Sequence, residues 1–343
     1  MSSIRVSFHF NLQVGSSSVS ARLHHGAKSA KMGASHLCLH YCYYQSAAGF
    51  AAFHRTAKAL ISKPSSTFLC RRRHHHRCLY RNTASAASAS CNTSKEIRST
   101  DLVALEFAEL NLPVSNKITG ELGHARIRQH VNPLSSSFTV PAPIPDWSEV
   151  YKNPTLPLMV DIGSGSGRFL IWLARRNPDS GNYLGLEIRQ KLVKRAEFWV
   201  QELALSNIHF LFANASVSFK QLVSSYPGPL MLVSILCPDP HFKKRHHKRR
   251  VVQKPLVDSI IDYLMPGGKV FVQSDVLEVA LDMRNQFDAE SKVLQHIDTI
   301  DPTVPCDSEG WLLNNPMGIR TEREIHAEFE GANIYRRMYQ KRI

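Results

Sequence analysis

The sequence predicts an α/β fold, in which helices cover both faces of a mostly parallel β-sheet. Three observations support this prediction. Short apolar runs alternate with helical patterns from Pro157 onward, at the spacing of strand–helix units. The runs are apolar without alternation, as expected of strands that are buried on both faces. Several of them end in an acid, as at ligand-binding strand ends.

The first two strand–helix units lie between residues 156 and 205. The run "LPLMVDIG" (156–163) reads as a strand, and "RFLIWLARRNP" (168–178) as a helix that ends before a proline. A second strand, "YLGLEI" (183–188), precedes "QKLVKRAEFWVQELAL" (190–205). The second segment has the period of an amphipathic helix, with one apolar face made of Leu192, Ala196, Trp199, Val200 and Leu203.

The next elements continue the alternation. A third strand, "IHFLFANA" (208–215), is followed by a helix and by the strand "PLMLVSILCPDP" (229–240). The segment "VVQKPLVDSIIDYLM" (251–265) reads as a helix, and "GGKVFVQSD" (267–275) as a further strand. In such sheets ligands bind beyond the carboxyl ends of the strands, so the residues at these ends are the candidates for function.

The first 95 residues differ in composition from the rest. They hold no Asp or Glu but thirteen of the 42 Lys and Arg residues, so nearly all of the formal charge of +14 arises there. An acid-free leader rich in Ser, Ala and Arg is typical of an organellar transit peptide. The alternative is a retained, disordered basic arm that binds RNA phosphates.

The remaining chain divides into an extension with a Pro-rich linker (96–150) and the α/β domain (151–343). Outside the leader only Cys237 and Cys306 remain, which excludes a disulfide framework. The leader segment "CRRRHHHRC" lacks the CxxC-type spacing of structural zinc sites, so we expect no metal. No apolar run is long enough to span a membrane, and no secretory signal is present.

A glycine-rich turn, "DIGSGSG" (161–167), follows the first strand. Gly163, Gly165 and Gly167 let the backbone turn sharply and approach a ligand closely. A triphosphate loop would need GK[S/T], whereas Arg168 follows the last glycine. A dinucleotide fingerprint would place its third glycine one residue later, which weakens an NAD site.

The following strand ends favour an adenosine cofactor. Glu187 can accept hydrogen bonds from both ribose hydroxyls, and Asn214 and Ala215 suit an adenine edge. In this order and at matching strand ends, these residues favour S-adenosylmethionine (SAM) over NAD.

The stretch "CPDPHFKKRHHKRR" (237–250) carries a single acid, Asp239, beside a basic run. The order of "RQHVNPLS" (128–135), "DIGSGSG", "GLEI" (185–188), this stretch, "QSD" (273–275) and "TEREIH" (321–326) resembles the tRNA (guanine-N7)-methyltransferase family. The similarity is greatest to its cyanobacterial and plant organellar members, and it covers about residues 120–343. It implies a class I SAM-dependent methyltransferase fold, Rossmann-like, with a seven-stranded sheet.

The resemblance also implies roles for individual residues. Asp161, Glu187, Asn214 and Asp239 would line the SAM site. Around the guanine it implies Lys243, Asp275, Thr321 and Glu324, again with Asp239. The chain departs from the family pattern in two places. Family members often have PDPW, whereas here His241 follows "PDP". They also often have T-x-F-E-x-R, whereas this chain has "TEREIH". These departures bear on the guanine contacts.

We therefore expect methyl transfer from SAM to N7 of a guanosine in the tRNA variable loop, with Asp239 as the catalytic residue. The phosphates of tRNA would contact the basic run, namely Lys244, Arg245, Lys248, Arg249 and Arg250. The alternatives are a solvated basic loop, a SAM enzyme with another substrate, and a catalytically weak RNA-binding scaffold. Besides tRNA we expect no membrane or obligate protein partner, a monomer or homodimer, and, from leader and resemblance together, a chloroplast location in preference to a mitochondrial one.

Overall fold

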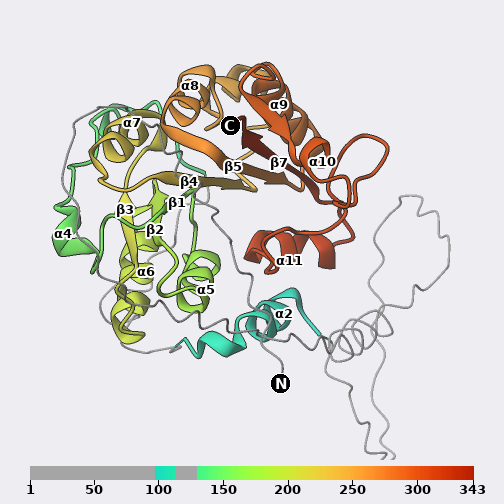
Figure 1. Cartoon of the computed structure of the whole chain (residues 1–343). Helices are drawn as coiled ribbons and strands as arrows, with labels where there is room; N and C mark the ends of the chain where they lie inside the picture. The colour runs from blue at the N-terminus through green and yellow to red at the C-terminus, as the bar shows by residue number, and fades with distance from the viewer. Residues whose placement is uncertain (1–96, 113–129) are drawn as a thin grey trace, which may run out of the picture. The chain divides into compact units, whose positions relative to one another are not determined.

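The computed structural model describes residues 97–112 and 130–343, and its central feature is a seven-stranded sheet (Figure 1). The strand order is β3-β2-β1-β4-β5-β7-β6, and β7 alone runs antiparallel to its neighbours. The predicted fold class is thus confirmed. The predicted leader and the first two residues of "RQHVNPLS" lie outside the described residues.

Strands β1 to β5 match the predicted apolar runs, with ends that differ by at most four residues, whereas β6 and β7 were not predicted individually. They are β1 (Leu158–Ile162), β2 (Asn182–Glu187), β3 (Ile208–Phe212), β4 (Leu230–Leu236), β5 (Leu264–Ser274), β6 (Leu294–His296) and β7 (Tyr335–Lys341). Every residue of β1 and β2 is buried, because helices cover both faces of the sheet there.

Helices α5 and α6 lie on one face of the sheet, and α7, α8 and α9 lie on the other (Figure 1). The helices are α2 (Ser99–Glu106), α4 (Trp147–Val150), α5 (Arg168–Arg176), α6 (Gln190–Glu202), α7 (Ala215–Ser225), α8 (Lys254–Tyr263), α9 (Leu277–Asp288), α10 (Ile297–Ile300) and α11 (Glu322–Phe329). Three short 3-10 turns are η1 (Ala108–Leu110), η2 (Ser136–Phe138) and η3 (Lys244–Arg249).

The order in which the chain adds strands reverses between β1 and β4, which are parallel. From β1 the chain continues outward to β2 and β3, whereas β4 pairs on the other side of β1 and leads to β5. In an open α/β sheet such a switch point leaves a crevice at the carboxyl ends of the two strands, where ligands bind. The glycine-rich turn after β1 and Asp239 after β4 both lie at this point.

The end of α8 differs from the expected helix at 251–265. The helix stops at Tyr263, and β5 begins at Leu264, which pairs with Leu230 before a register shift leads into the main ladder. Pro255 lies in the first turn of α8, where its missing N–H costs no hydrogen bond.

Part of the extension before residue 151 packs on the α/β domain. Trp147 stacks on Tyr151 with ring centroids 5.9 Å apart, and its Nε1 donates to Ser225 Oγ at 3.0 Å. Glu106, at the end of α2, accepts hydrogen bonds from the Arg320 guanidinium at 2.6 and 3.2 Å. The predicted boundary at 150/151 therefore falls inside one core cluster that holds Trp147 and Tyr151.

Within the described ranges, no helix combines the length and the apolar character that a membrane crossing requires.

Candidate functional site

The three glycines after β1 have different tasks. All adopt left-handed φ angles, +82° at Gly163, +56° at Gly165 and +83° at Gly167. A Cβ at Gly167 would lie 2.7 Å from Ala196 Cβ and 2.9 Å from Phe210 Cζ, so this glycine permits close packing of α5 on its neighbours. A Cβ at Gly163 would meet no atom within 4 Å. The turn therefore presents an open face at its first glycine.

Two buried carboxylates stand beside this turn. Glu187, at the end of β2, is 2% exposed and accepts a hydrogen bond from the backbone N–H of Gly165 at 2.9 Å. Asp161, in β1, is 4% exposed and accepts from Ser234 Oγ at 2.6 Å. Burial raises the pKa of Asp161 to about 7, and the charge of Glu187 adds to the increase. The turn is thus lined by two buried carboxyl groups.

Arg189 covers Glu187, which the sequence analysis did not predict. Its Nε lies 2.8 Å from Glu187 Oε1 and its Nη2 lies 3.1 Å from Oε2. Burial lowers the pKa of Arg189, but the hydrogen bonds and charge of Glu187 and the charge of Asp239 outweigh it, so the net shift is upward. A ribose could reach the Glu187 oxygens only by sharing them with Arg189 or by displacing it. The signal was present in the sequence, because Arg189 follows "GLEI" directly.

Asn214 serves first as an anchor. Its Oδ1 accepts from the backbone N–H of Ser216 at 3.2 Å and caps α7. Its Nδ2 donates to the carbonyl oxygens of Pro133 and Phe138 at 3.1 and 3.0 Å, which holds the 130–139 segment over the end of β3. Both donors of Asn214 are therefore used within the chain, and contact of Asn214 and Ala215 with an adenine stays a prediction.

Asp239 stands between two histidines. His130 Nδ1 lies 2.9 Å from Asp239 Oδ2, and the backbone N–H of His241 donates to Oδ1 at 3.4 Å. The Asp239 side chain is still 27% exposed. His130 was not among the predicted site residues, since it precedes Asp239 by 109 positions and no local spacing joins the two.

The turn that carries Asp239 is conformationally unusual. Cys237 and His241, on either side of "PDP", have φ angles of +50° and +44°. Such angles in residues other than glycine cost on the order of 1 kcal/mol or more each and persist only where the surroundings impose them. Here the backbone N–H of Cys237 donates to the Gln273 carbonyl oxygen at 2.7 Å. The turn is therefore held in one shape beside β5.

The basic run divides into exposed and buried members. Lys243, Lys244, Arg245 and Lys248 are exposed, and Arg249 is half-buried. Arg250 is 5% exposed and is bound to Glu278 at 2.9 Å, to Asp282 at 3.2 Å and to the Pro240 carbonyl oxygen at 2.9 Å. The prediction that Arg250 binds phosphate is therefore wrong, because both of its charged partners lie on α9 and no face remains for RNA.

An aromatic side chain stands next to the basic run. Phe242 is 67% exposed, although it is a large apolar residue. It follows the Asp239 turn directly and precedes Lys243. The sequence analysis did not single it out, because exposure of a lone phenylalanine cannot be read from spacing.

The remaining predicted substrate residues lie around α11. Asp275, after β5, accepts hydrogen bonds from Arg323 at 2.6 and 3.0 Å. Thr321 caps α11, since its Oγ1 accepts from the backbone N–H of Glu324 at 3.1 Å while Glu324 Oε2 accepts from the backbone N–H of Thr321 at 3.2 Å. This reciprocal pair is a capping box.

Glu324 has no exposed surface. Its carboxylate accepts from Gln273 Nε2 at 3.0 Å, Asn315 Nδ2 at 3.1 Å and Arg336 Nη2 at 2.5 Å. A direct guanine contact by Glu324 is thus not supported, because every approach to its carboxylate is filled by the protein. Its place is behind Thr321, which it fixes in position.

The raised pKa of Asp161 leads to a pH-dependent prediction. Between about pH 4 and 7 the folded state holds a proton on Asp161 that the unfolded chain has released, so this group's contribution to stability falls as pH rises through that window. The shift of about three units corresponds to at most about 4 kcal/mol. We expect Asp161→Asn to raise the free energy of unfolding by about 1–3 kcal/mol at pH 8 relative to wild type, and by much less at pH 5.

Urea denaturation of both proteins at the two pH values measures this effect. Ser234→Ala is the matched control, because it removes the hydroxyl that donates to the ionised Asp161 and should destabilise the protein more at pH 8 than at pH 5. Equal differences between Asp161→Asn and wild type at both pH values would contradict the prediction.

Comparison with known proteins identifies the family. Residues 155–337 match the family model described as "Putative methyltransferase". A tRNA (guanine-N(7)-)-methyltransferase from a Synechococcus species is 49% identical over 221 residues, which cover 64% of this chain and 86% of that protein. One from a Synechocystis species is 44% identical over 220 residues, 64% of this chain and 99% of that protein.

Among solved structures, an rRNA methylase from Streptococcus thermophilus superposes with a TM-score of 0.36 and 13% identity, over 57% of this chain and 92% of that one. That similarity is too low to bear on function. The family model covers more than half of the chain, and the two cyanobacterial proteins are matched over most of their length. Together with the glycine turn, Glu187 and Asp239 at the switch point of the sheet, these matches show that the chain belongs to the tRNA (guanine-N7)-methyltransferase family.

Proposed function

We propose that this chain transfers the methyl group of SAM to N7 of a guanosine in the variable loop of tRNA. The observation that carries the proposal is the position of Asp239. This carboxylate is partly exposed at the end of β4, its charge acts on Arg189 of the glycine-turn site, and the basic turn η3 follows it in the chain. The two cyanobacterial relatives are tRNA (guanine-N7)-methyltransferases by name, which supports the same reaction here.

The residues of the glycine turn fit SAM as the cofactor. Ser164 Oγ is buried without a hydrogen-bond partner, and space is open in front of Gly163. The carboxylates of Asp161 and Glu187 suit a ligand that carries positive charge and hydroxyl groups. When bound, SAM supplies an electrophilic methyl group on a sulfonium centre. Gly163, Gly165, Glu187 and Asp161 would hold it, with Asn214 and Ala215 near the adenine.

The chemistry explains why an acid stands at the edge of a basic surface. Guanine N7 has an exposed lone pair, so its methylation needs alignment and no removal of a proton from N7. Positive charge develops on the purine during the reaction, and a fixed carboxylate stabilises that charge. At 4 Å and an effective dielectric constant near 20, the interaction is worth about 4 kcal/mol as an upper value. In this proposal Asp239 supplies that carboxylate.

The exposed basic residues would bind the tRNA backbone. Lys243, Lys244, Arg245 and Lys248 point their charge toward solvent, with Arg249 contributing in part. The exposed ring of Phe242 offers an unpaired base a surface for stacking, which is how single-stranded regions of RNA are commonly held.

Removal of three of these charges should weaken tRNA binding and its salt dependence. We expect Lys244→Ala, Arg245→Ala and Lys248→Ala together to reduce the slope of log K against log salt by about 2–3, because each lost phosphate contact changes it by roughly 0.7–0.9. Filter binding of tRNA between low and moderate salt measures the slope.

The matched control removes three exposed lysines elsewhere, Lys152, Lys220 and Lys292. Its slope should stay near the wild-type value. Equal slopes in both triple variants would show that η3 is a solvated loop.

The reaction is tested by incubating the full chain with SAM and unmodified tRNA transcripts, followed by mass spectrometry of the nucleosides. We expect 7-methylguanosine, and cleavage at the modified base should map it to the variable loop. Another methylated nucleoside would favour a different RNA reaction. Binding of tRNA without methylation would favour a catalytically weak RNA-binding scaffold.

We further propose that residues 1–95 direct the protein to the chloroplast. The support is the acid-free, Ser-rich and Arg-rich composition of this segment, together with relatives from cyanobacteria. A fluorescent protein fused behind residues 1–95 should accumulate in plastids, and a mitochondrial or diffuse signal would contradict the proposal.

A further inference from the structure

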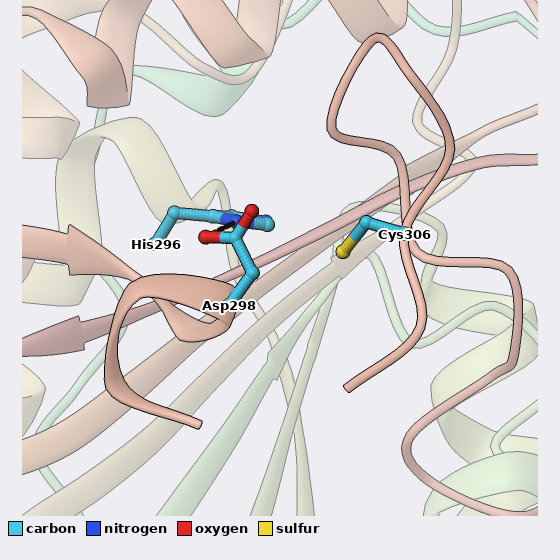
Figure 2. A group of neighbouring side chains, drawn as sticks. All are labelled: His296, Asp298 and Cys306. Atoms are coloured by element: carbon cyan, nitrogen blue, oxygen red, sulfur yellow. Dashed lines mark ion pairs between the residues drawn. The ribbon is translucent and has the colours of Figure 1, made fainter. Parts of the chain in front are cut away.

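We propose that His296, Asp298 and Cys306 bind a zinc ion at the β6 edge of the sheet. Their three ligand atoms lie within 4.8 Å of one another. Figure 2 shows the Asp298 carboxylate against the His296 ring, with Cys306 approaching from a separate segment of the chain. The site is three strands away from β4 and is distinct from the Asp239 site.

The three proposed ligands lie within eleven consecutive residues, 296–306. His296 is the last residue of β6, Asp298 lies in the first turn of α10, and Cys306 lies in the loop that follows. A β-bridge between Cys306 and Leu312 fixes the position of the cysteine in that loop. The sequence analysis expected no metal and did not consider "HIDTIDPTVPC" (296–306), because this segment has no CxxC-type spacing and the cluster forms only when the loop folds back.

His296 is the observation that points to a ligand. The residue is 8% exposed, and its Nδ1 is paired with Asp298 Oδ1 at 2.6 Å. Its Nε2 is buried and has no hydrogen-bond partner among the described residues. A buried ring nitrogen without a hydrogen bond is unfavourable, and a bound metal would satisfy the imidazole.

The donor set matches zinc. Zinc binds thiolate sulfur, imidazole nitrogen and carboxylate oxygen in a tetrahedron, with bonds of about 2.0–2.3 Å. Such bonds place the ligand atoms roughly 3.3–3.7 Å apart. The histidine–aspartate contact, now 2.6 Å, would therefore open by about 1 Å, and the widest separation, at most 4.8 Å, would close by up to about 1.5 Å. Because Cys306 is only half-buried, water can supply the fourth ligand.

The groups around the site carry charges of both signs. The carboxylates of Asp288 and Asp307 act on His296 and Cys306 respectively, in addition to Asp298 itself. Arg337 opposes them, but its guanidinium also lies 3.4 Å from Asp288.

A metal here would join the loop after α10 to the sheet. This loop also borders a cavity of about 280 Å³, lined by Ile297, Asp301 and Leu312 among others, so packing alone does not fill the space beneath it. The loop leads to Asn315, which donates to Glu324 beside Thr321. Zinc would thus fix the segment that leads to α11.

Site-resolved alkylation of the full chain tests the proposal. The leader holds other cysteines and histidines, so total zinc content is not informative. We expect micromolar Zn²⁺ to slow the alkylation of Cys306 by iodoacetamide at least 10-fold, measured on its own peptide by mass spectrometry. Cys237 in the same sample is the internal control, and its rate should change less than 2-fold.

In Asp298→Asn and His296→Gln the protection of Cys306 should fall below about 2-fold. Asp298 is half-exposed, so its variant should remain folded, and circular dichroism checks this for both. Wild-type Cys306 that reacts equally fast with and without Zn²⁺ would overturn the proposal, as would equal protection by Mg²⁺, which prefers oxygen ligands.

Discussion

Asp239→Asn should lower the single-turnover rate of guanosine methylation by roughly 100- to 1,000-fold, which corresponds to about 2.7–4 kcal/mol of transition-state stabilisation. Asparagine keeps the shape of the side chain and can still accept from the His241 backbone N–H, which lies 3.4 Å from Oδ1 in the wild type. The substitution removes the negative charge. If that charge stabilises the developing positive charge on the purine, the loss appears in the chemical step.

Single-turnover measurements with enzyme in excess isolate this step, and separate binding assays should show SAM and tRNA affinities within a few-fold of wild type. His130→Ala is the matched control. It removes the histidine 2.9 Å from Asp239 but leaves the carboxylate, so we expect its rate to stay within about 10-fold of wild type. A near-normal rate for Asp239→Asn would eliminate the electrostatic role and leave alignment by the neighbouring residues as the source of catalysis.

The sequence correctly predicted the position of the candidate residues at strand ends. Glu187 is the last residue of β2 and Asp239 comes three residues after β4, and the carboxyl ends of parallel strands meet at one edge of the sheet. Local pattern is enough in such cases. Arg189 could have been found in the same way, because it follows "GLEI".

Other residues depend on contacts between distant segments. The burial of Arg250 follows from Glu278 and Asp282, which come 28 and 32 residues later on α9. His130 meets Asp239 across 109 residues. No spacing in the sequence encodes these pairs. Arg250 was therefore predicted to bind phosphate because it lies in a basic run, although it forms ion pairs within the fold.

The burial of Arg336 in β7 likewise depends on contacts with distant segments. The sequence of β7, "YRRMYQK", reads as polar, yet Arg336 is buried in it because Glu324 and Gln273 receive its guanidinium. The position of its partner Glu324 in a helix cap can be recognised from the sequence. "TERE" at 321–324 fits the S/T-x-x-E pattern of a capping box, which predicts that Thr321 and Glu324 begin a helix. The burial of Glu324 depends on β5 and β7 and could not be predicted.

Glu324→Ala should destabilise the fold by about 3–5 kcal/mol, the cost of removing the buried partner of a buried ion pair. Arg336 is 7% exposed and would keep its charge, with Glu328 at 3.4 Å as its remaining carboxylate partner. Gln273 and Asn315 would each lose an acceptor, and α11 would lose half of its capping box. Chemical denaturation followed by circular dichroism measures the change.

Two variants separate this structural role from a direct guanine contact. Asp275→Ala removes an acid whose partner Arg323 is 50% exposed, so it should cost only about 1 kcal/mol or less. In the double variant Glu324→Ala/Arg336→Ala the buried guanidinium is removed as well, and the total loss should be smaller than the sum of the two single losses. If Glu324→Ala instead unfolded at the same denaturant concentration as wild type while methylation of tRNA was lost, Glu324 would be a substrate ligand after all, and the buried network around it would contribute little to the stability of the fold.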